Sequence, residues 1–201
     1  MLLNERKIVS SEEIRILAKE LGKSEWDSLS YLQRHGYITR ILKGIFYVRS
    51  PNEIELEGYD YTIHELVAKA LDFKGVERWY FGLNSGLKFN NMTHEYFNIE
   101  YVITDSYRTT KVIKIMDYDF KFIKRGESHF GYGVEEKDDV YYSDPEKTVL
   151  DISYQRYLKD KGSTYFYSPM KEYEDLLDME KIFSYLEHYP KKFRDRMSDR
   201  L

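Results

Sequence analysis

Apolar residues recur at helical spacing in two short segments near the start of the chain. The first segment follows a Ser-Ser-Glu-Glu start that is typical of a capping box and ends at Gly22; its apolar positions are Ile14, Leu17, Ala18 and Leu21. The second begins at Ser24, a favourable N-cap, and runs to about His35, directly before Gly36. The pattern therefore predicts two helices joined by a turn at Gly22-Lys23.

The second predicted helix is amphipathic. At about 100° per residue, one of its sides carries Trp26, Leu29, Leu32 and Gln33. The other side is polar and carries Ser24, Asp27, Ser28, Tyr31, Arg34 and His35. We therefore expect the first side to pack within the domain and the polar side to meet a partner.

A β-hairpin is expected directly after this helix. Residues 37–42 and 45–49 are rich in β-branched and aromatic side chains, and only Lys43-Gly44 separates them, which predicts a two-residue turn. That turn sets a register in which Leu42 pairs with Ile45, Ile41 with Phe46 and Arg40 with Tyr47. One face of the hairpin would then carry Ile41, Phe46 and Val48, and the other Arg40, Tyr47 and Arg49.

Two helices followed by a two-stranded wing predict a winged helix-turn-helix, in which the second helix enters the major groove and the wing lies along the DNA backbone. The residues expected to contact DNA are Lys23, Ser28, Tyr31 and Arg34 from the helix, and Arg40, Lys43 and Arg49 from the wing. The alternative is a small α/β module that only packs or dimerises.

The character of the chain changes after Ser50-Pro51, where an acidic connection with little periodicity follows. We place a boundary near residue 58, giving domains of residues 1–58 and 59–201. The second domain reads as a helix capped by Thr62, strands near 79–81, 99–104, 112–116, 120–124 and 140–142, a helix opened by Asp144-Pro145-Glu146, and helical segments near 170–177 and 179–188 before a basic tail. This order predicts an α+β fold with a mostly antiparallel sheet and C-terminal helices.

Composition limits the possible classes of protein. With 201 residues, 42% of them hydrophobic, the chain can build two small cores. It has no cysteine, no apolar run of membrane-spanning length and no signal-like apolar stretch in MLLNERK, so we expect a cytoplasmic protein with no membrane contact and no disulfide.

The charge is distributed unevenly along the chain. Residues 1–50 hold nine Lys/Arg against six Asp/Glu, and the remainder holds 22 against 29, so a net +3 precedes a net −7. This asymmetry favours an N-terminal part that approaches phosphates. Glu25 and Asp27 on the second helix oppose strong general affinity for DNA.

Three stretches in this order resemble the AbiEi-type antitoxin family over nearly the whole chain. They are the wing ending in Lys43-Gly44-Ile45-Phe46-Tyr47-Val48, the run Phe81-Gly82-Leu83-Asn84-Ser85-Gly86-Leu87, and Asp144-Pro145-Glu146-Lys147-Thr148-Val149-Leu150-Asp151. The resemblance implies a winged helix-turn-helix followed by an antitoxin domain. It implies a regulator that represses its own operon and counters a nucleotidyltransferase-like toxin encoded beside it, without necessarily binding it tightly. A stand-alone winged-helix regulator is the alternative.

One recognition helix reads only a few base pairs, so we expect two copies on a promoter inverted repeat, as a homodimer on DNA. The candidate self-contact residues are Phe183, Tyr185, Leu186 and Phe193, although core packing would also account for Phe183 and Leu186.

A nucleotidyltransferase-fold enzyme is a further alternative, because Phe81–Ser85 followed by residues 98–105 has the outline of that fold. The required pair of carboxylates two residues apart is missing, since Glu100 and Asp105 are five residues apart. His35, His64, His94, His129 and His188 show no metal-binding spacing. We therefore expect no enzyme activity, no metal and no cofactor.

Overall fold

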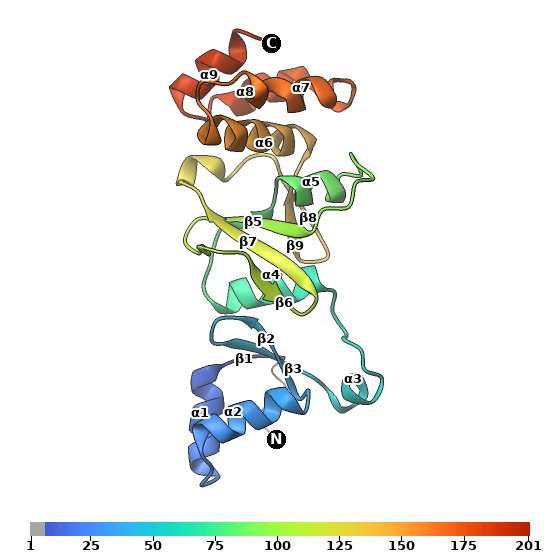
Figure 1. The fold of residues 1–201 in the computed structure, drawn as a ribbon, viewed down its shortest axis with the longest axis vertical. Coiled ribbons are helices and arrows are strands. Elements are labelled where there is room, and N and C mark those ends of the chain that lie inside the picture. The colour runs from blue at the N-terminus through green and yellow to red at the C-terminus, as the bar shows by residue number, and fades with distance from the viewer. Residues whose placement is uncertain (1–6) are drawn as a thin grey trace. The chain divides into compact units, whose positions relative to one another are not determined.

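The computed structural model describes residues 7–201 and divides the chain into two compact units (Figure 1). The first unit takes the chain up to Glu77 together with Lys114–Asp117, and the second takes Arg78–Ile113 and Tyr118–Leu201. The division therefore falls after Glu77 rather than near residue 58, because the helix capped by Thr62 groups with the N-terminal elements. No helix in the described range is long and apolar enough to cross a membrane.

The first unit contains three strands and four helices among its described residues. Their bounds are β1 Ile8–Ser10, α1 Ser11–Glu20, α2 Glu25–Arg34, β2 Ile38–Leu42, β3 Ile45–Val48, α3 Pro51–Glu55 and α4 Ile63–Phe73. The two predicted helices, the hairpin and the helix after Thr62 are confirmed. Strand β1 and helix α3 were not predicted.

Local capping explains where the helices begin. Ser10 and Glu13 form a complete capping box at the start of α1, as predicted, and Ser50 with Glu53 forms another at the start of α3. At α2, the Ser24 hydroxyl accepts a hydrogen bond from the Asp27 backbone N–H at 3.5 Å.

The three strands form one antiparallel sheet in the order β1-β3-β2. Leu42 pairs with Ile45 as predicted, but Arg40 pairs with Phe46 because a bulge shifts the register between Arg40 and Leu42. Ile41 is the extra residue, and both Ile41 and Leu42 are buried. The predicted pairs Ile41 with Phe46 and Arg40 with Tyr47 are therefore wrong.

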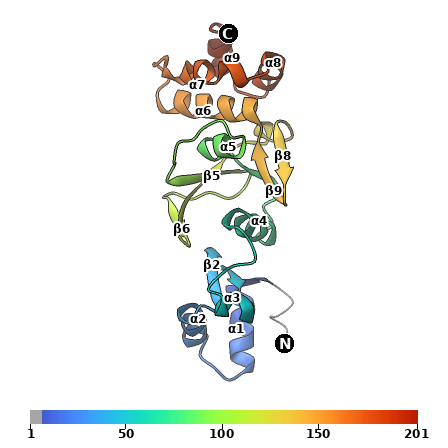
Figure 2. The same ribbon diagram turned by 90° about the vertical axis from the view of Figure 1, so that its right-hand side faces the viewer.

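The sheet is covered by helices on both faces (Figure 2). Helices α1 and α2 pack on one face, where Val9, Ile14, Ile38 and Phe46 form a buried cluster. Helix α4 packs on the sheet from the other face. The short strands thus form the middle layer of the unit.

A buried carboxylate ties α3 to the sheet. Glu53 is 3% exposed and accepts hydrogen bonds from the Tyr47 hydroxyl at 2.5 Å, the Ser50 N–H at 2.7 Å and the Asp60 N–H at 2.8 Å, while Lys7 Nζ lies 3.0 Å away. Burial alone would raise the pKa of Glu53, but these hydrogen bonds outweigh burial and hold that pKa well below its usual range. The acidic connection read from the sequence is therefore an ordered segment.

The second unit combines a sheet with a set of helices. Its elements are β4 Trp79–Phe81, α5 Asn84–Phe89, β5 Ile99–Thr104, β6 Ile113–Ile115, β7 Tyr118–Lys124, β8 Val134–Lys137, β9 Val140–Ser143, α6 Pro145–Lys159, α7 Ser168–Glu172, α8 Met179–Leu186 and α9 Lys191–Ser198. The last two residues of β6 are grouped with the first unit. The α+β class is confirmed, and β8 is an addition to the predicted strands.

The sheet of this unit is mixed and not mostly antiparallel as predicted. Its order is β6-β7-β5-β4-β9-β8. Strand β5 runs parallel to β7, and β4 runs parallel to β9, whereas β4 with β5 and β8 with β9 are antiparallel. Alternation of apolar residues marks a strand but does not identify its neighbours, so the sequence pattern carried no information on these pairings.

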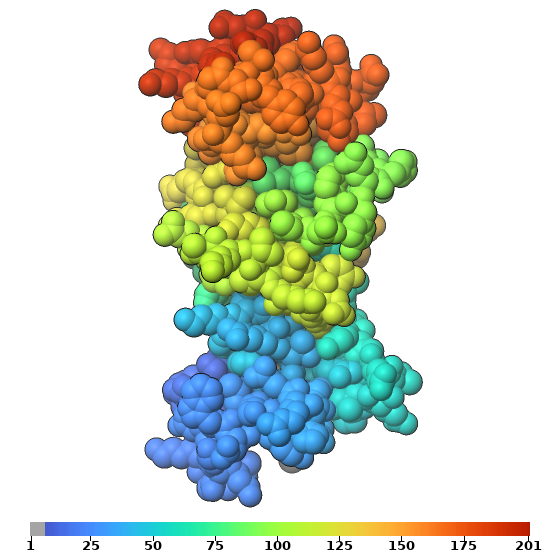
Figure 3. Space-filling view, viewed as in Figure 1, coloured from blue at the N-terminus to red at the C-terminus, as the bar shows by residue number. Residues whose placement is uncertain are grey.

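Helix α6 lies between the sheet and helices α7–α9 (Figures 1 and 2). Residues of α6 to α9 share one core cluster, which includes Leu150, Ile182, Leu186 and Phe193. In the space-filling view these helices form a continuous orange-to-red surface (Figure 3). The predicted basic tail is therefore the amphipathic helix α9. Leu186 and Phe193 are unavailable for self-contact because this core buries them, whereas Phe183 is half exposed.

Candidate nucleic-acid interface

One side of α2 and the turn between β2 and β3 border a surface hollow of about 370 Å³. No residue of the predicted polar side of α2 lines this hollow. Its lining residues are Ser11, Ile14, Arg15, Glu25, Trp26, Leu29, Gln33, Arg40, Lys43, Gly44 and Phe46. Three of these side chains are cationic and only one is acidic. The hollow therefore brings the start of α1, one side of α2 and the hairpin turn together on an electropositive surface.

Trp26 is the most exposed aromatic side chain at this hollow. It is 81% exposed, although the sequence placed it on the packing side of α2. That placement is wrong because the packing stripe is centred between Leu29 and Leu32, about 90° around the helix from Trp26. Gln33 is exposed for the same reason. Trp26 and Gln33 thus line the hollow, although neither is among the residues predicted to contact DNA.

The acidic residues of α2 have different surroundings. Glu25 pairs with Arg15, whose Nε lies 2.8 Å from Glu25 Oε2, and Arg15 also pairs with Glu12 at 2.9 Å. The negative charge of Glu25 is therefore compensated inside the hollow. Asp27 lies on the other side of α2, so Glu25 is the acid of this helix that borders the hollow beside the hairpin turn.

The predicted contact residues do not form one surface. Arg40 and Lys43 line the hollow beside the hairpin, while Lys23, Ser28 and Tyr31 line a separate groove between α1 and α2. Arg34 is exposed and donates a hydrogen bond to Ser30 at 3.4 Å. The sequence could not separate these sets because helical spacing gives angles around α2 without showing which side the hairpin occupies.

Arg49 forms contacts within the first unit. Its guanidinium donates hydrogen bonds to the backbone carbonyls of Gly36 at 3.3 Å, of Gly58 at 3.1 Å and of Glu53, and it lies 4.8 Å from the centre of the Tyr59 ring. Three loop ends therefore converge on this one side chain. The expectation of a DNA-contacting Arg49 does not fit these contacts, because its donors are directed inward.

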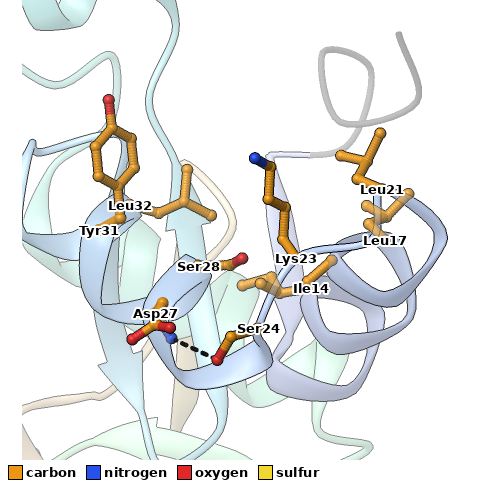
Figure 4. A pocket seen from close by; sticks show the side chains of 10 residues that line it. Ile14, Leu17, Leu21, Lys23, Ser24, Asp27, Ser28, Tyr31 and Leu32 are labelled. Carbon is orange, nitrogen blue, oxygen red and sulfur yellow. Dashed lines mark hydrogen bonds between the residues drawn. The ribbon is translucent and has the colours of Figure 1, made fainter.

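The groove between α1 and α2 has a volume of about 540 Å³ and a mostly apolar lining (Figure 4). Ile14 and Ala18 are buried at its base, and Leu17, Leu21, Tyr31 and Leu32 also line it. Lys23, Ser24, Asp27 and Ser28 complete the lining. This surface resembles a packing site more closely than a phosphate site.

In the second unit, the start of α6 holds a buried lysine. Lys147 is fully buried, and its Nζ lies 3.6 Å from Asp151 Oδ2 and over the rings of Tyr132 at 4.1 Å and Tyr80 at 4.8 Å. Burial lowers the pKa of Lys147, and the adjacent Asp151 carboxylate opposes that shift. Sequence spacing alone could have indicated this i,i+4 pair, but not its burial.

Asp144 and Glu146 complete the same helix start. Asp144 caps α6 by accepting from the Lys147 backbone N–H at 2.8 Å and also accepts from the Tyr185 hydroxyl at 2.8 Å. Glu146 accepts from the Asp178 backbone N–H at 2.9 Å. The charged residues of this motif therefore hold helices α6 and α8 together.

The carboxylates considered for a nucleotidyltransferase are engaged by other side chains. Glu100 accepts from Ser85 Oγ at 2.5 Å and from Lys88 Nζ at 2.7 Å, and Asp105 pairs with Arg78 at 3.2 Å. Between residues 7 and 201, no group of three His, Cys, Asp or Glu side chains is arranged to hold a metal ion.

Comparison with known proteins gives a likeness in fold. No family model matches the chain, and no curated protein matches it. The fold is similar to the crystal structure of the RV2827C protein from Mycobacterium tuberculosis, with a TM-score of 0.56 and 12% sequence identity over 97% of this chain and 71% of that chain. At this identity the likeness shows a shared fold and carries no information on activity.

Proposed function

We propose that this protein is a DNA-binding transcriptional regulator whose first unit is a winged helix-turn-helix. In this proposal α2 enters the major groove and the β2–β3 hairpin is the wing. The observation that carries the proposal is the shared hollow, in which Arg40 of β2 and Lys43 of the hairpin turn border an exposed side of α2. The net positive charge of the first fifty residues supports the same reading.

The proposed contacts fall into two classes. Arg40 and Lys43 have the chemistry for phosphates, whereas Gln33 and Arg34 have the donors that read adenine and guanine edges. Trp26 offers an apolar surface for sugars or thymine methyl groups. Phosphate contacts should dominate the affinity, because the helix presents few side chains able to read bases.

A mobility-shift titration on duplex DNA from the region upstream of the gene, repeated at several salt concentrations, tests the proposal. Each neutralised phosphate contributes about 0.9 to the slope of log affinity against log salt, so Arg40→Ala with Lys43→Ala should reduce that slope by nearly two. The matched control is Lys159→Ala with Lys161→Ala, which removes the same charge from the second unit. Absence of a shift by the unmodified protein at low salt would refute DNA binding.

We further propose that the second unit supplies an antitoxin activity, as its resemblance to AbiEi-type antitoxins implies, against a nucleotidyltransferase-like toxin encoded nearby. Full-length protein carrying Arg40→Ala and Lys43→Ala separates the two activities. It should lose promoter repression and still protect cells that express the neighbouring toxin. Loss of protection together with repression would show that the antitoxin proposal is wrong, and a gene neighbourhood without such a toxin would favour a stand-alone regulator.

A further inference from the structure

The apolar groove between α1 and α2 has an uncovered wall. Leu21 is 74% exposed and Tyr31 is 53% exposed, although both line a groove whose base is formed by buried Ile14 and Ala18. Figure 4 shows Leu17 and Leu21 projecting from α1, with Tyr31 and Leu32 on the α2 side. Exposed apolar side chains gathered around a concave surface are typical of a protein-contact site.

The charges at the rim of this groove indicate the kind of partner. Lys23 lies at the turn between the helices and Asp27 lies on α2, and neither forms an ion pair within the described part of the chain. A rim that carries one unpaired cation and one unpaired anion is complementary to itself under two-fold symmetry. A rim of a single sign would repel a second copy of the same surface.

The groove between α1 and α2 and the hollow beside the hairpin turn occupy different sides of α2. Of their lining residues only Ile14 is common to both, and it is buried beneath them. A partner seated in the groove would therefore leave Arg40 and Lys43 uncovered. This separation is what a regulator requires if it is to bind DNA and a partner protein together.

We propose that a second copy of this chain docks on the α1–α2 groove, with Leu21 of each copy inserted into the groove of the other and Lys23 of each facing Asp27 of the other. The proposal deepens, and rests on, the proposed function, since it provides the two-fold contact for two half-sites of an inverted repeat. The surface is small for a permanent dimer, so association in free solution should be weak and concentration-dependent.

Sedimentation velocity over a wide range of protein concentration tests the contact. The unmodified protein should shift from monomer towards dimer as concentration rises, and Leu21→Asp should raise the dissociation constant about tenfold or more. The matched control is Leu56→Asp, because Leu56 is 80% exposed in the same unit and lies outside the groove. Equal effects of the two substitutions, or a monomer at every concentration, would overturn the proposal.

A charge exchange tests the orientation of the two copies. Lys23→Asp alone and Asp27→Lys alone should each weaken the dimer through like-charge contacts, and the double exchange should restore it. Additive weakening in the double variant would contradict the proposed pairing. Far-ultraviolet circular dichroism of each variant checks that the total helical content is unchanged.

Binding to DNA with one or two half-sites separates this inference from the proposed function. Leu21→Asp should bind a single half-site like the unmodified protein and lose cooperativity on the repeat. Cooperativity that persists in Leu21→Asp would overturn the groove contact and leave DNA binding standing, whereas a dimer that binds no DNA would do the reverse. The solvent exposure of the Leu21 methyl groups, measured by NMR, identifies the occupant of the groove. If these methyl groups are shielded at every protein concentration and become exposed when residues 1–6 are deleted, the occupant is the protein's own N-terminal segment and the proposal is wrong.

Discussion

Lys147 Nζ lies 3.6 Å from Asp151 Oδ2, one turn further along α6, and both side chains are removed from solvent. Asp151 also accepts hydrogen bonds from the Tyr80 hydroxyl at 2.8 Å and the Tyr189 hydroxyl at 2.7 Å. One carboxylate therefore links α6 to β4 and to the segment after α8. The charge of Lys147 has no other carboxylate as close among its described contacts.

Replacing Asp151 should strongly destabilise the second unit. Asp151→Asn leaves the lysine charge buried without its counterion, and breaking a buried pair in this way costs about 3–5 kcal/mol. Urea denaturation of the variant measures the loss. The double variant Lys147→Met with Asp151→Asn should recover part of it, and a double variant less stable than Asp151→Asn would show that the pair is not electrostatically coupled.

The stability of the second unit should fall between about pH 6.5 and pH 4. Burial lowers the pKa of His129 to about 4, with Asp151 opposing the shift and Lys147 adding to it. The unfolded chain therefore takes up a proton near pH 6.5 while the folded state does not, which costs on the order of 3 kcal/mol by pH 4. His129→Phe should flatten this part of the stability profile, because the variant lacks the group that takes up the proton. The substitution breaks no hydrogen bond, since neither ring nitrogen of His129 has a partner in the described structure.

Replacing Glu53 should weaken the first unit in a pH-dependent manner. Hydrogen bonds hold the pKa of Glu53 below its usual value of about 4.3, so its contribution to stability is present above that pH and is lost as the pH falls further. We expect Glu53→Gln to be less stable than the unmodified protein at neutral pH and to approach it in acid. A constant difference across that range would contradict the role of the charge.

Replacing Arg49 should reduce stability, whereas replacing Arg40 should reduce DNA affinity. Arg49→Ala leaves the carbonyls of Gly36, Glu53 and Gly58 without their shared donor, so we expect a loss of about 1–3 kcal/mol in unfolding free energy. Arg40 is exposed, and Arg40→Ala should change stability by less than about 0.5 kcal/mol while reducing DNA affinity. Paired denaturation and mobility-shift measurements compare the two.

Local signals in the sequence predicted the elements whose caps and periodicity agree. Thr62 and Asp144 begin α4 and α6 as expected, and strand β5 has the predicted bounds. Helix α3 was missed because five residues are too few for a periodic pattern. Strand β1 was missed because its three residues depend on pairing with β3, a contact distant in sequence.

The surroundings of the candidate interface residues were predicted only in part, because they too depend on contacts distant in sequence. Arg40 and Lys43 are exposed because they lie beside and within a hairpin turn, and their contact with DNA stays a prediction. Trp26 and Arg49 were misplaced because their environments depend on the hairpin and on the loop after β3, which the helical pattern of α2 does not contain. Tertiary contacts, not local propensity, decide which side chain of a polar face remains available.

The bulge at Ile41 makes the pairing register of β2 as important as the identity of its residues. Because side chains alternate along a strand, the extra residue places Arg40 opposite Phe46, on the face that packs against α2. A regular ladder that kept Ile41 in register would instead pair Arg40 with Tyr47 and turn Arg40 towards the α4 face, with every charge of the hairpin retained. Loss of the bulge would therefore remove Arg40 from the hollow proposed to contact DNA without changing a single residue of the chain.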